Sequence, residues 1–300
     1  MDILLKNCVD LHLHSHYSDG LHPPEELVRM AAKKGVRAIA LTDHDSVDGI
    51  DEALAAGERL GVEVIPAVEL TVSLRGYRDV HLLGYFIDHR DQAFAARLAT
   101  FRKSRDERGR TIVDRINARL SRDNRENITY EEVLAFAGGA VGRPHIARVL
   151  IGRRLARDIE DAFDKFLKPC NVPKFQFPMA DAITEIKRIG GIAVLAHPAS
   201  ISMERSTVQT MIREMVKLGL EGLEVFANMC YKEDIIYFNN IAKRLGLAIT
   251  GGSDYHGFDD DMELGFGRRE PALSYRLVEK LKDVQERRYG TTAIKGIYHG

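Results

Sequence analysis

Apolar and polar residues alternate along the first ninety residues in a pattern that predicts short buried strands separated by amphipathic helices. Near-continuous apolar runs predict strands over residues 9–14, 36–42, 62–70 and 80–87. A helix opens with Pro23 and Pro24 and closes at Gly35, and another stops at Gly61. This repeat of strands and helices is typical of parallel strands covered by helices.

The pattern changes after about residue 91. Residues 91–121 have helical spacing with many Arg and Ala, and Thr129 followed by Glu132 is a capping-box signature. Shorter helices are predicted over residues 143–154 and 158–167. We therefore predict an inserted helical cap subdomain over residues 98–180, with residues 1–97 and 181–300 forming the α/β domain around it.

The pattern of strands and helices resumes after this insertion. Strands are predicted over residues 192–196, 222–226 and 247–250, and helices over residues 180–189, 205–218, 231–245 and 273–288. About seven strands in all, interrupted once, predict an α/β barrel with an inserted helical subdomain.

The composition excludes several classes of protein. The 300 residues are 45% hydrophobic and 29% charged, and 43 Lys and Arg balance 44 Asp and Glu. A net charge of −1 argues against long duplex DNA as a partner. Three cysteines without paired spacing predict neither a disulfide framework nor a thiolate zinc site. No apolar run resembles a signal peptide or a membrane span of about 18 residues, so we expect a cytoplasmic protein that binds no membrane.

Histidines and carboxylates gather where the predicted strands end. His12 and His14 are two residues apart on one strand, so their side chains share a face, and Asp19 follows in the loop. The others at or just beyond a strand end are Asp43, His44, Asp45, Glu69, His197, Asp254 and His256. The C-terminal strand ends of a parallel barrel converge on one face, where we expect these groups to meet. His81, near the beginning of its strand, fits this rule least well.

Each of these residues alone has an ordinary explanation. A single histidine beside a strand is usually a core or surface residue, Asp43 could belong to a helix cap, and Asp254 could form a polar turn. Their joint placement favours a metal site. Imidazole and carboxylate donors without thiolates suit Mn²⁺, Fe²⁺ or Zn²⁺, with Mg²⁺ also open. The number of donors predicts two or three divalent ions, with manganese as our first expectation, and closely spaced ions suit phosphoryl chemistry.

Five ordered stretches resemble the motifs of the PHP (polymerase and histidinol phosphatase) family of metal-dependent phosphoesterases. They are residues 10–20, 41–45, 66–70, 196–198 and 252–256. The resemblance spans residues 8–257 and implies a distorted (β/α)7 barrel with metals at the C-terminal face of the strands. It implies one site of His12, His14, Glu69 and Asp254, a second of Asp19, His44 and His256, and a third in which Glu69 is joined by His81 and His197.

Residues 142–147, Gly-Arg-Pro-His-Ile-Ala, lie in the predicted insertion and resemble a stretch of the stand-alone PHP branch that acts on nucleotides and short RNA. Arg143 could clamp a phosphate bidentately, and His145 could donate a proton or a hydrogen bond. On the residues alone, both could equally be solvated polar residues at a helix start. We also expect Asp43 to contact substrate.

The resemblance implies hydrolysis of a phosphate monoester in a small nucleotide, first of all the 3′-phosphate of a nucleoside 3′,5′-bisphosphate, leaving an AMP-like product. A 5′→3′ exonuclease on short RNA uses the same chemistry. A histidinol-phosphate or other sugar-phosphate phosphatase is a further alternative. A non-catalytic PHP module is the alternative from another class, and the complete set of ligand positions weighs against it.

Overall fold

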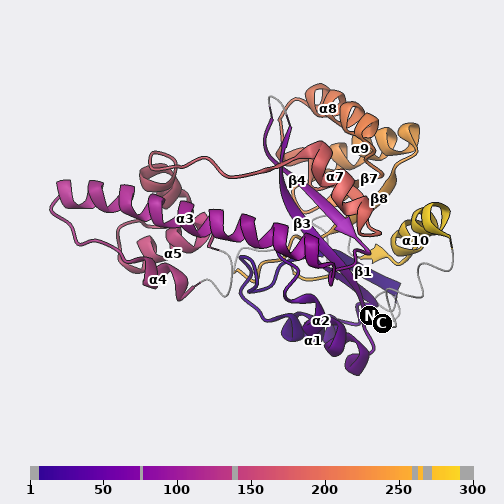
Figure 1. The fold of residues 1–300 in the computed structure, drawn as a ribbon, viewed down its shortest axis with the longest axis horizontal. Helices are drawn as coiled ribbons and strands as arrows, with labels where there is room; N and C mark the ends of the chain where they lie inside the picture. The colour runs from indigo at the N-terminus through magenta and orange to yellow at the C-terminus, as the bar shows by residue number, and fades with distance from the viewer. Residues whose placement is uncertain (1–6, 75–76, 137–140, 259–262, 266–271, 291–300) are drawn as a thin grey trace.

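A nearly closed barrel of strands forms the centre of the molecule, and a long helix projects from it (Figure 1). This computed structural model describes residues 7–74, 77–136, 141–258, 263–265 and 272–290. The strand order is β8-β7-β6-β4-β3-β2-β1-β9, and β5 pairs with β3. The strands are β1 (Cys8–Leu13), β2 (Ala38–Leu41), β3 (Glu63–Leu74), β4 (Tyr77–Tyr85), β5 (Phe177–Pro178), β6 (Ile192–Leu195), β7 (Gly222–Ala227), β8 (Ala248–Gly252) and β9 (Leu273–Ser274).

The two ends of the barrel wall meet where β8 runs into the following loop. The backbone N–H of Asp254 donates to the carbonyl of His12 at 3.0 Å, and that of His14 donates to the carbonyl of Tyr255 at 2.9 Å. These bonds place the segment after β8 beside the end of β1. Residues more than two hundred positions apart in the sequence therefore share one edge of the barrel.

Strand β4 runs against its neighbours, which corrects the prediction of an all-parallel wall. The strands β1, β2 and β3 are parallel, as are β6, β7 and β8, but β4 is antiparallel to both β3 and β6. Its first half consequently lies at the C-terminal end of β3, where His81 is paired with Thr71. The reversed direction explains why a histidine early in its strand reaches the same face as the others.

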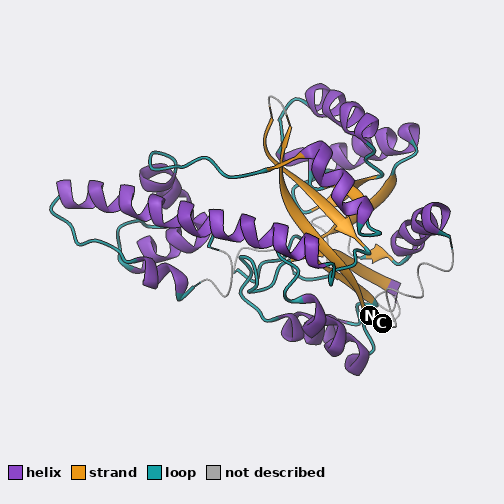
Figure 2. Cartoon of the chain, in the orientation of Figure 1, coloured by secondary structure: helices purple, strands orange, loops and turns teal. Residues whose placement is uncertain are grey.

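Helices cover the outside of the barrel, α1 and α2 over one part and α7, α8 and α9 over another (Figures 1 and 2). Their C-terminal glycines Gly35 and Gly61 adopt left-handed backbone angles, φ 74° and 70°, as the sequence suggested. No helix among the described residues combines the length and apolarity needed to cross a membrane. The helices are α1 (Pro24–Lys34), α2 (Ile50–Leu60), α3 (Gln92–Arg122), α4 (Tyr130–Leu134), α5 (Arg143–Gly152), α6 (Ile159–Ala162), α7 (Met179–Arg188), α8 (Arg205–Leu218), α9 (Lys232–Leu245) and α10 (Arg276–Tyr289), with short turns η2 (Phe163–Leu167) and η3 (Pro198–Ser200).

The 31-residue helix α3 belongs to two hydrophobic cores. Near its beginning, Phe94, Leu98 and Phe101 pack into the core that surrounds the barrel. Farther along, Ile112 and Ile116 pack into a separate core with α4, α5 and η2. We call the distal half of α3 together with α4, α5, α6 and η2 the cap. The helical character predicted for this segment is confirmed, whereas the predicted boundaries at residues 98 and 180 stay a prediction.

Candidate metal centre

The predicted metal ligands converge at one end of the barrel. Three groups of side chains there offer donor atoms that all lie within 4.8 Å of one another. The groups are His12, His14, Glu69 and Asp254; His14, Asp19, His44 and His256; and His44, Glu69 and His81. Four of these eight side chains, His12, His14, Asp19 and Glu69, are buried, and the other four are half-buried. The C-terminal strand ends and the reversed β4 together bring donors from distant parts of the chain to one place.

The first group is the most compact. The Nε2 atoms of His12 and His14 lie 3.3 and 3.2 Å from Oε2 of Glu69. The same two nitrogens lie 3.4 and 3.2 Å from Oδ1 of Asp254. Two imidazoles thus face two carboxylates around a common centre, which agrees with the set that the sequence implied for its first metal.

The second group adds a residue to the set expected from the sequence. Nε2 of His256 lies 3.3 Å from Oδ1 of Asp19, and Nε2 of His44 lies 3.9 Å from the other Asp19 oxygen. His14 joins them through Nδ1, 3.9 Å from Asp19. The His14 ring therefore stands between the first two groups, with one nitrogen toward each.

Glu69 connects the first group to the third. Its Oε2 lies 3.0 Å from Nδ1 of His44, and its Oε1 lies 3.0 Å from Nδ1 of His81. His197 contacts the same Oε1 at 3.0 Å and Nδ1 of His81 at 3.3 Å, although it belongs to none of the three compact groups. The bridging position implied for Glu69 is thus present in the geometry.

Several buried donor atoms at this centre have no hydrogen-bond partner among the described residues, a costly arrangement unless a cation binds them. They are His12 Nε2, His14 Nδ1 and Nε2, Asp19 Oδ1, His44 Nδ1, Glu69 Oε2 and His81 Nε2. All are nitrogen or carboxylate oxygen atoms, which suit borderline divalent cations. These residues therefore fit a multinuclear metal site.

The protonation states follow from burial and from the mixture of charges. Burial lowers the pKa of His12, but Glu224, Glu69 and Asp254 outweigh it and raise that pKa well above its usual value. Burial likewise opposes the charge of Asp19, yet His44 and His256 hold its pKa well below the usual range. Burial instead lowers the pKa of His44 well below its usual value. The centre therefore combines groups that its charges hold ionised, such as Asp19 and His12, with imidazoles that burial keeps neutral, and a bound cation would replace the protons that remain.

A layer of buried carboxylates supports the ligands from beneath. Glu224 on β7 contacts Nδ1 of His12 at 2.9 Å and accepts from the backbone N–H of His197 at 2.7 Å. Asp10 accepts from the backbone N–H and the hydroxyl of Ser253, at 2.9 and 2.6 Å. The sequence interpretation missed Glu224, whose only signal was an acid within the otherwise apolar strand Gly222–Ala227. Carboxylates in this position orient the ligating imidazoles.

Asp43, for which the sequence predicted a contact with substrate, belongs to the same layer of buried carboxylates. Its side chain is buried, and its Oδ1 accepts from the backbone N–H of Ser15 and the hydroxyl of Ser18, at 2.7 and 2.6 Å. Its Oδ2 accepts from the hydroxyl of Ser15 at 2.6 Å. Through these bonds Asp43 holds the loop that follows β1, and its contact with substrate stays a prediction.

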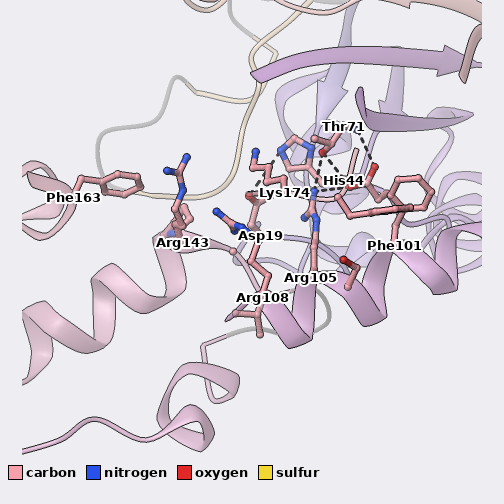
Figure 3. Close-up of a pocket in the computed structure, with 15 residues that line it drawn as sticks. Asp19, His44, Thr71, Phe101, Arg105, Arg108, Arg143, Phe163 and Lys174 are labelled. Atoms are coloured by element: carbon pink, nitrogen blue, oxygen red, sulfur yellow. Dashed lines mark hydrogen bonds and ion pairs between the residues drawn. The ribbon is translucent and has the colours of Figure 1, made fainter. Parts of the chain in front are cut away.

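A pocket extends from the metal centre toward the cap (Figure 3). Asp19 and His44 form its metal side, and Figure 3 shows Arg105 and Arg108 of α3 beside them. The pocket is also lined by Phe101, Arg143, Phe163, Lys174 and Phe175. Arg105 also bonds Oδ2 of Asp45 at 2.7 Å. A strongly cationic wall therefore adjoins the predicted metal ligands, a suitable environment for a phosphorylated ligand.

The two residues predicted in the insertion lie at the start of α5, on the cap side of this pocket. Arg143 lines the pocket, with its guanidinium 5.2 Å from the centre of the Phe163 ring. His145 is buried, and its Nδ1 accepts from the backbone N–H of Gly142 at 3.0 Å. Burial lowers the pKa of His145. A neutral His145 with Nδ1 as acceptor carries its proton on Nε2.

Comparison of the sequence with known protein families identifies its family: residues 10–172, more than half of the chain, match the PHP domain. The chain belongs to the PHP domain family. This PHP domain protein is 34% identical to a 3′,5′-nucleoside bisphosphate phosphatase of Chromobacterium violaceum, over 83% of this chain and 87% of the relative. It is 33% identical to a 5′-3′ exoribonuclease of Haemophilus influenzae, over 85% and 92% of the two chains.

Solved structures agree with this family. The structure of an amidohydrolase from Chromobacterium violaceum, with bound sulfate and no metal, superposes with a TM-score of 0.78 and 31% identity over 91% of this chain and 96% of the other. The fold is thus the PHP barrel with the long helix α3 inserted, as the sequence predicted. The protein is a metal-dependent phosphoesterase, a hydrolase of the PHP family.

Proposed function

We propose that this phosphoesterase removes the 3′-phosphate of a nucleoside 3′,5′-bisphosphate. The observation that carries the proposal is the pocket in which the predicted ligands Asp19 and His44 adjoin a separate cationic wall of Arg105, Arg108 and Arg143. One phosphate would lie at the metal centre and the second against this wall. A substrate with a single phosphate would use only the first of these positions.

The shape and lining of the pocket support a nucleoside as the rest of the substrate. Its volume of about 180 Å³ suits a sugar phosphate better than a whole nucleotide, so the base would lie at the rim. Phe175 lies there with 57% of its surface exposed, and its ring is 4.9 Å from that of Phe101 behind it. An exposed aromatic ring held by a second ring is a suitable surface for a nucleobase.

The residues divide the chemistry between them. Divalent ions at this centre would polarise the phosphate oxygens and supply hydroxide at neutral pH. Arg143 would hold the uncleaved phosphate, and the Nε2–H of His145 would donate a hydrogen bond near the scissile phosphate. The donors here, imidazole and carboxylate, suit Mn²⁺ first and leave Fe²⁺, Zn²⁺ and Mg²⁺ open. The cytoplasm is the compartment in which we expect this reaction.

Substrate comparison tests the proposal. The purified protein, loaded with Mn²⁺, is assayed against adenosine 3′,5′-bisphosphate, 5′-phosphorylated short RNA and histidinol phosphate, with products identified by ³¹P NMR. We expect the bisphosphate to have the highest kcat/KM and to yield the 5′-monophosphate. A higher value for RNA would support the 5′→3′ exonuclease, which the Haemophilus relative favours. A preference for histidinol phosphate, or no hydrolysis at all, would contradict the proposal.

A further inference from the structure

A second cationic hollow lies on the cap, apart from the metal-side pocket. It has a volume of about 880 Å³ and opens to solvent between the ends of α3 and α5 and the turn η2. Its basic lining residues are Arg119, Arg125, Arg154, Arg157 and Lys165. We call this site the distal basic hollow.

Most of the positive charge of the distal basic hollow is not neutralised. Asp161 pairs with Arg157 at 3.3 Å and with Lys165 at 2.8 Å, and Asp123 also lines the hollow. Arg119, Arg125 and Arg154 form no ion pair with any other part of the chain that the structure describes. Arg125 and Arg154 are exposed, and Arg119 is half-buried over the ring of Phe166. Guanidinium groups gathered in this way repel one another and attract an anion.

Two helices, α3 and α5, run from the metal-side pocket to this hollow, and the length of each gives the distance between the two sites. Arg143 at the beginning of α5 lines the metal-side pocket, whereas Arg154, just past the end of α5, lines the distal hollow. The 10 residues of α5 span about 15 Å. On α3, Arg105 lines one pocket and Arg119 the other, and the fourteen positions between them span about 21 Å.

The two hollows also lie on the same side of α3. Arg108 lines the metal-side pocket, and Arg119 follows eleven positions later, which is close to three full helical turns. Arg115 lies between them on this side and donates to the carbonyl of Asn171 at 2.6 Å. A row of arginines on one face therefore leads from the metal centre to the distal hollow.

We propose that the distal basic hollow binds the backbone phosphates of a short single-stranded RNA whose 5′-terminal nucleotide occupies the metal-side pocket. That nucleotide carries the same two phosphates as a nucleoside 3′,5′-bisphosphate, its 3′-phosphate being esterified to the next nucleotide. A stacked strand advances about 3.4 Å per nucleotide, so a span of about 15 to 21 Å corresponds to about four to six nucleotides. This inference rests on the proposed function only for the placement of the 5′ end.

Binding measurements on the full-length, Mn²⁺-loaded protein test the inference. The probes are 5′-phosphorylated RNAs of two and eight nucleotides with phosphorothioate linkages, which slow hydrolysis, measured by fluorescence anisotropy. The variant, which we call the cap variant, carries Arg119→Gln, Arg125→Gln and Arg154→Gln. We expect at least a tenfold weaker Kd for the eight-nucleotide RNA, with the dinucleotide unchanged. The slope of log K against log salt should fall in magnitude by about two, since about 0.7 counterions are released per single-strand phosphate contact.

A matched control exists on the barrel helices. Arg213, Arg244 and Arg276 are exposed and form no ion pair with another described residue, so their triple Gln variant should bind both RNAs as the wild type does. Thermal unfolding of both variants checks that the fold is intact. Unchanged binding of the eight-nucleotide RNA to the cap variant would overturn the inference.

Two further measurements distinguish RNA binding in the hollow from binding of a free polyphosphate and from the proposed function. If tripolyphosphate binding is lost in the cap variant while RNA binding is retained, the hollow is a site for a free polyphosphate and the RNA assignment is overturned. Hydrolysis of adenosine 3′,5′-bisphosphate by the cap variant, expected at the wild-type rate, reports on the proposed function alone. A wild-type protein that lacks this hydrolysis but shows length-dependent RNA binding would therefore contradict the proposed function and leave the distal hollow supported.

Discussion

Glu224 contacts two residues of the metal centre, His12 and His197. Its two oxygens contact Nδ1 of His12 and the backbone N–H of His197, and the carboxylate is fully buried. A carboxylate behind a ligating imidazole fixes the orientation of the ring and increases its basicity. Glu224 would therefore act through His12 and is a positioning residue.

Replacing this carboxylate should weaken metal binding without removing a ligand. We expect Glu224→Gln, which keeps the shape of the side chain but loses its charge, to lower metal affinity or kcat/KM about 10- to 100-fold. Metal titration and elemental analysis measure the metal affinity. The pH profile of kcat/KM should also change in shape, because Glu224 contacts the His12 ring. Glu214→Gln on the exposed face of α8 is the control. Wild-type affinity and activity in Glu224→Gln would show that the contact is only structural.

Arg143 provides a test of the second phosphate position. Losing a charged bidentate contact should cost about 2 to 4 kcal/mol of transition-state binding, roughly 30- to 1000-fold in kcat/KM. We expect Arg143→Ala to lower kcat/KM by this factor for the bisphosphate and far less for a simple aryl phosphate. Equal losses on both would place Arg143 at the reacting phosphate, and no loss on either would make it a solvated residue of α5.

Most of the ligand residues could be predicted from the sequence because they are polar side chains at or just beyond the end of a predicted apolar strand. His81, near the beginning of its strand, is the exception. His12 and His14 also share a face through their two-residue spacing. Glu224 could not be predicted in this way, because a single acid within a strand does not reveal its partner. Arg105 and Phe175 were missed for a related reason, since they reach the pocket only when α3 and the segment before β5 pack against the barrel.

Among the elements, α3 connects the two hydrophobic cores, because it starts on the barrel and ends in the cap. Asp91 caps its first turn, where the side chain accepts from the backbone N–H of Phe94 at 2.8 Å. The same carboxylate contacts Arg188 of α7 at 2.7 and 2.8 Å. The ion pair with Arg188 and the cap bond lower the pKa of Asp91 to about 2. Asp91 thus joins two helices that follow different strands.

The contribution of Asp91 should depend on pH. Because its folded pKa of about 2 is below the unfolded value of about 3.9, its stabilisation is complete above pH 4 and disappears as the pH falls toward 2. We expect Asp91→Ala to lower the free energy of unfolding by about 1 kcal/mol at pH 7. Urea unfolding at both ends of this range measures the difference. Asp91→Asn should keep most of the stabilisation from the N-cap hydrogen bond to Phe94. If the difference in unfolding free energy between wild type and Asp91→Ala does not shrink in acid, the assignment is contradicted.

Most helices and strands were predicted close to their observed positions, and α8 spans the predicted residues 205–218. The direction of β4 was missed because the prediction gave all strands one direction, although the nine residues between the predicted strands 62–70 and 80–87 are too few for a parallel crossover. In the structure β3 ends at Leu74 and β4 already begins at Tyr77. So short a connection permits antiparallel pairing, whereas a parallel crossover needs a dozen residues or more. The strands β5 and β9, of two residues each, are too short to produce a pattern.

At the scale of the whole molecule, the metal centre joins the two ends of the barrel wall. Its predicted ligands come from β1 and the loop after it, from β3 and β4, and from the segments after β2, β6 and β8. The unfolded chain cannot hold these residues together, so an ion binds the folded state preferentially. Metal binding and folding should consequently be coupled.

Removing the metal should destabilise and inactivate the protein together. An ion present at about 100 times its Kd contributes about 2.7 kcal/mol per site, which corresponds to a Tm difference of about 5 °C or more. We expect dialysis against a chelator to lower Tm by this amount and to abolish activity, and Mn²⁺ to restore both. His14→Ala and Asp254→Ala should show low metal content and little activity, whereas His89→Ala, outside the centre, should not. A chelated wild type that stays fully active would contradict a metal-dependent reaction.

The continuity of α3 has a consequence for how substrate enters. A lid opens about a hinge. The connection from the barrel to the cap through α3 is one continuous helix of 31 residues, with no loop that could serve as a hinge. Even its glycine, Gly109, is held, because a Cβ there would meet the ring of Tyr130 at 3.1 Å. Swinging the cap would require breaking the helix. We therefore expect the cap to keep a nearly fixed position beside the pocket, so that the enzyme would select substrates by whether they fit its entrance.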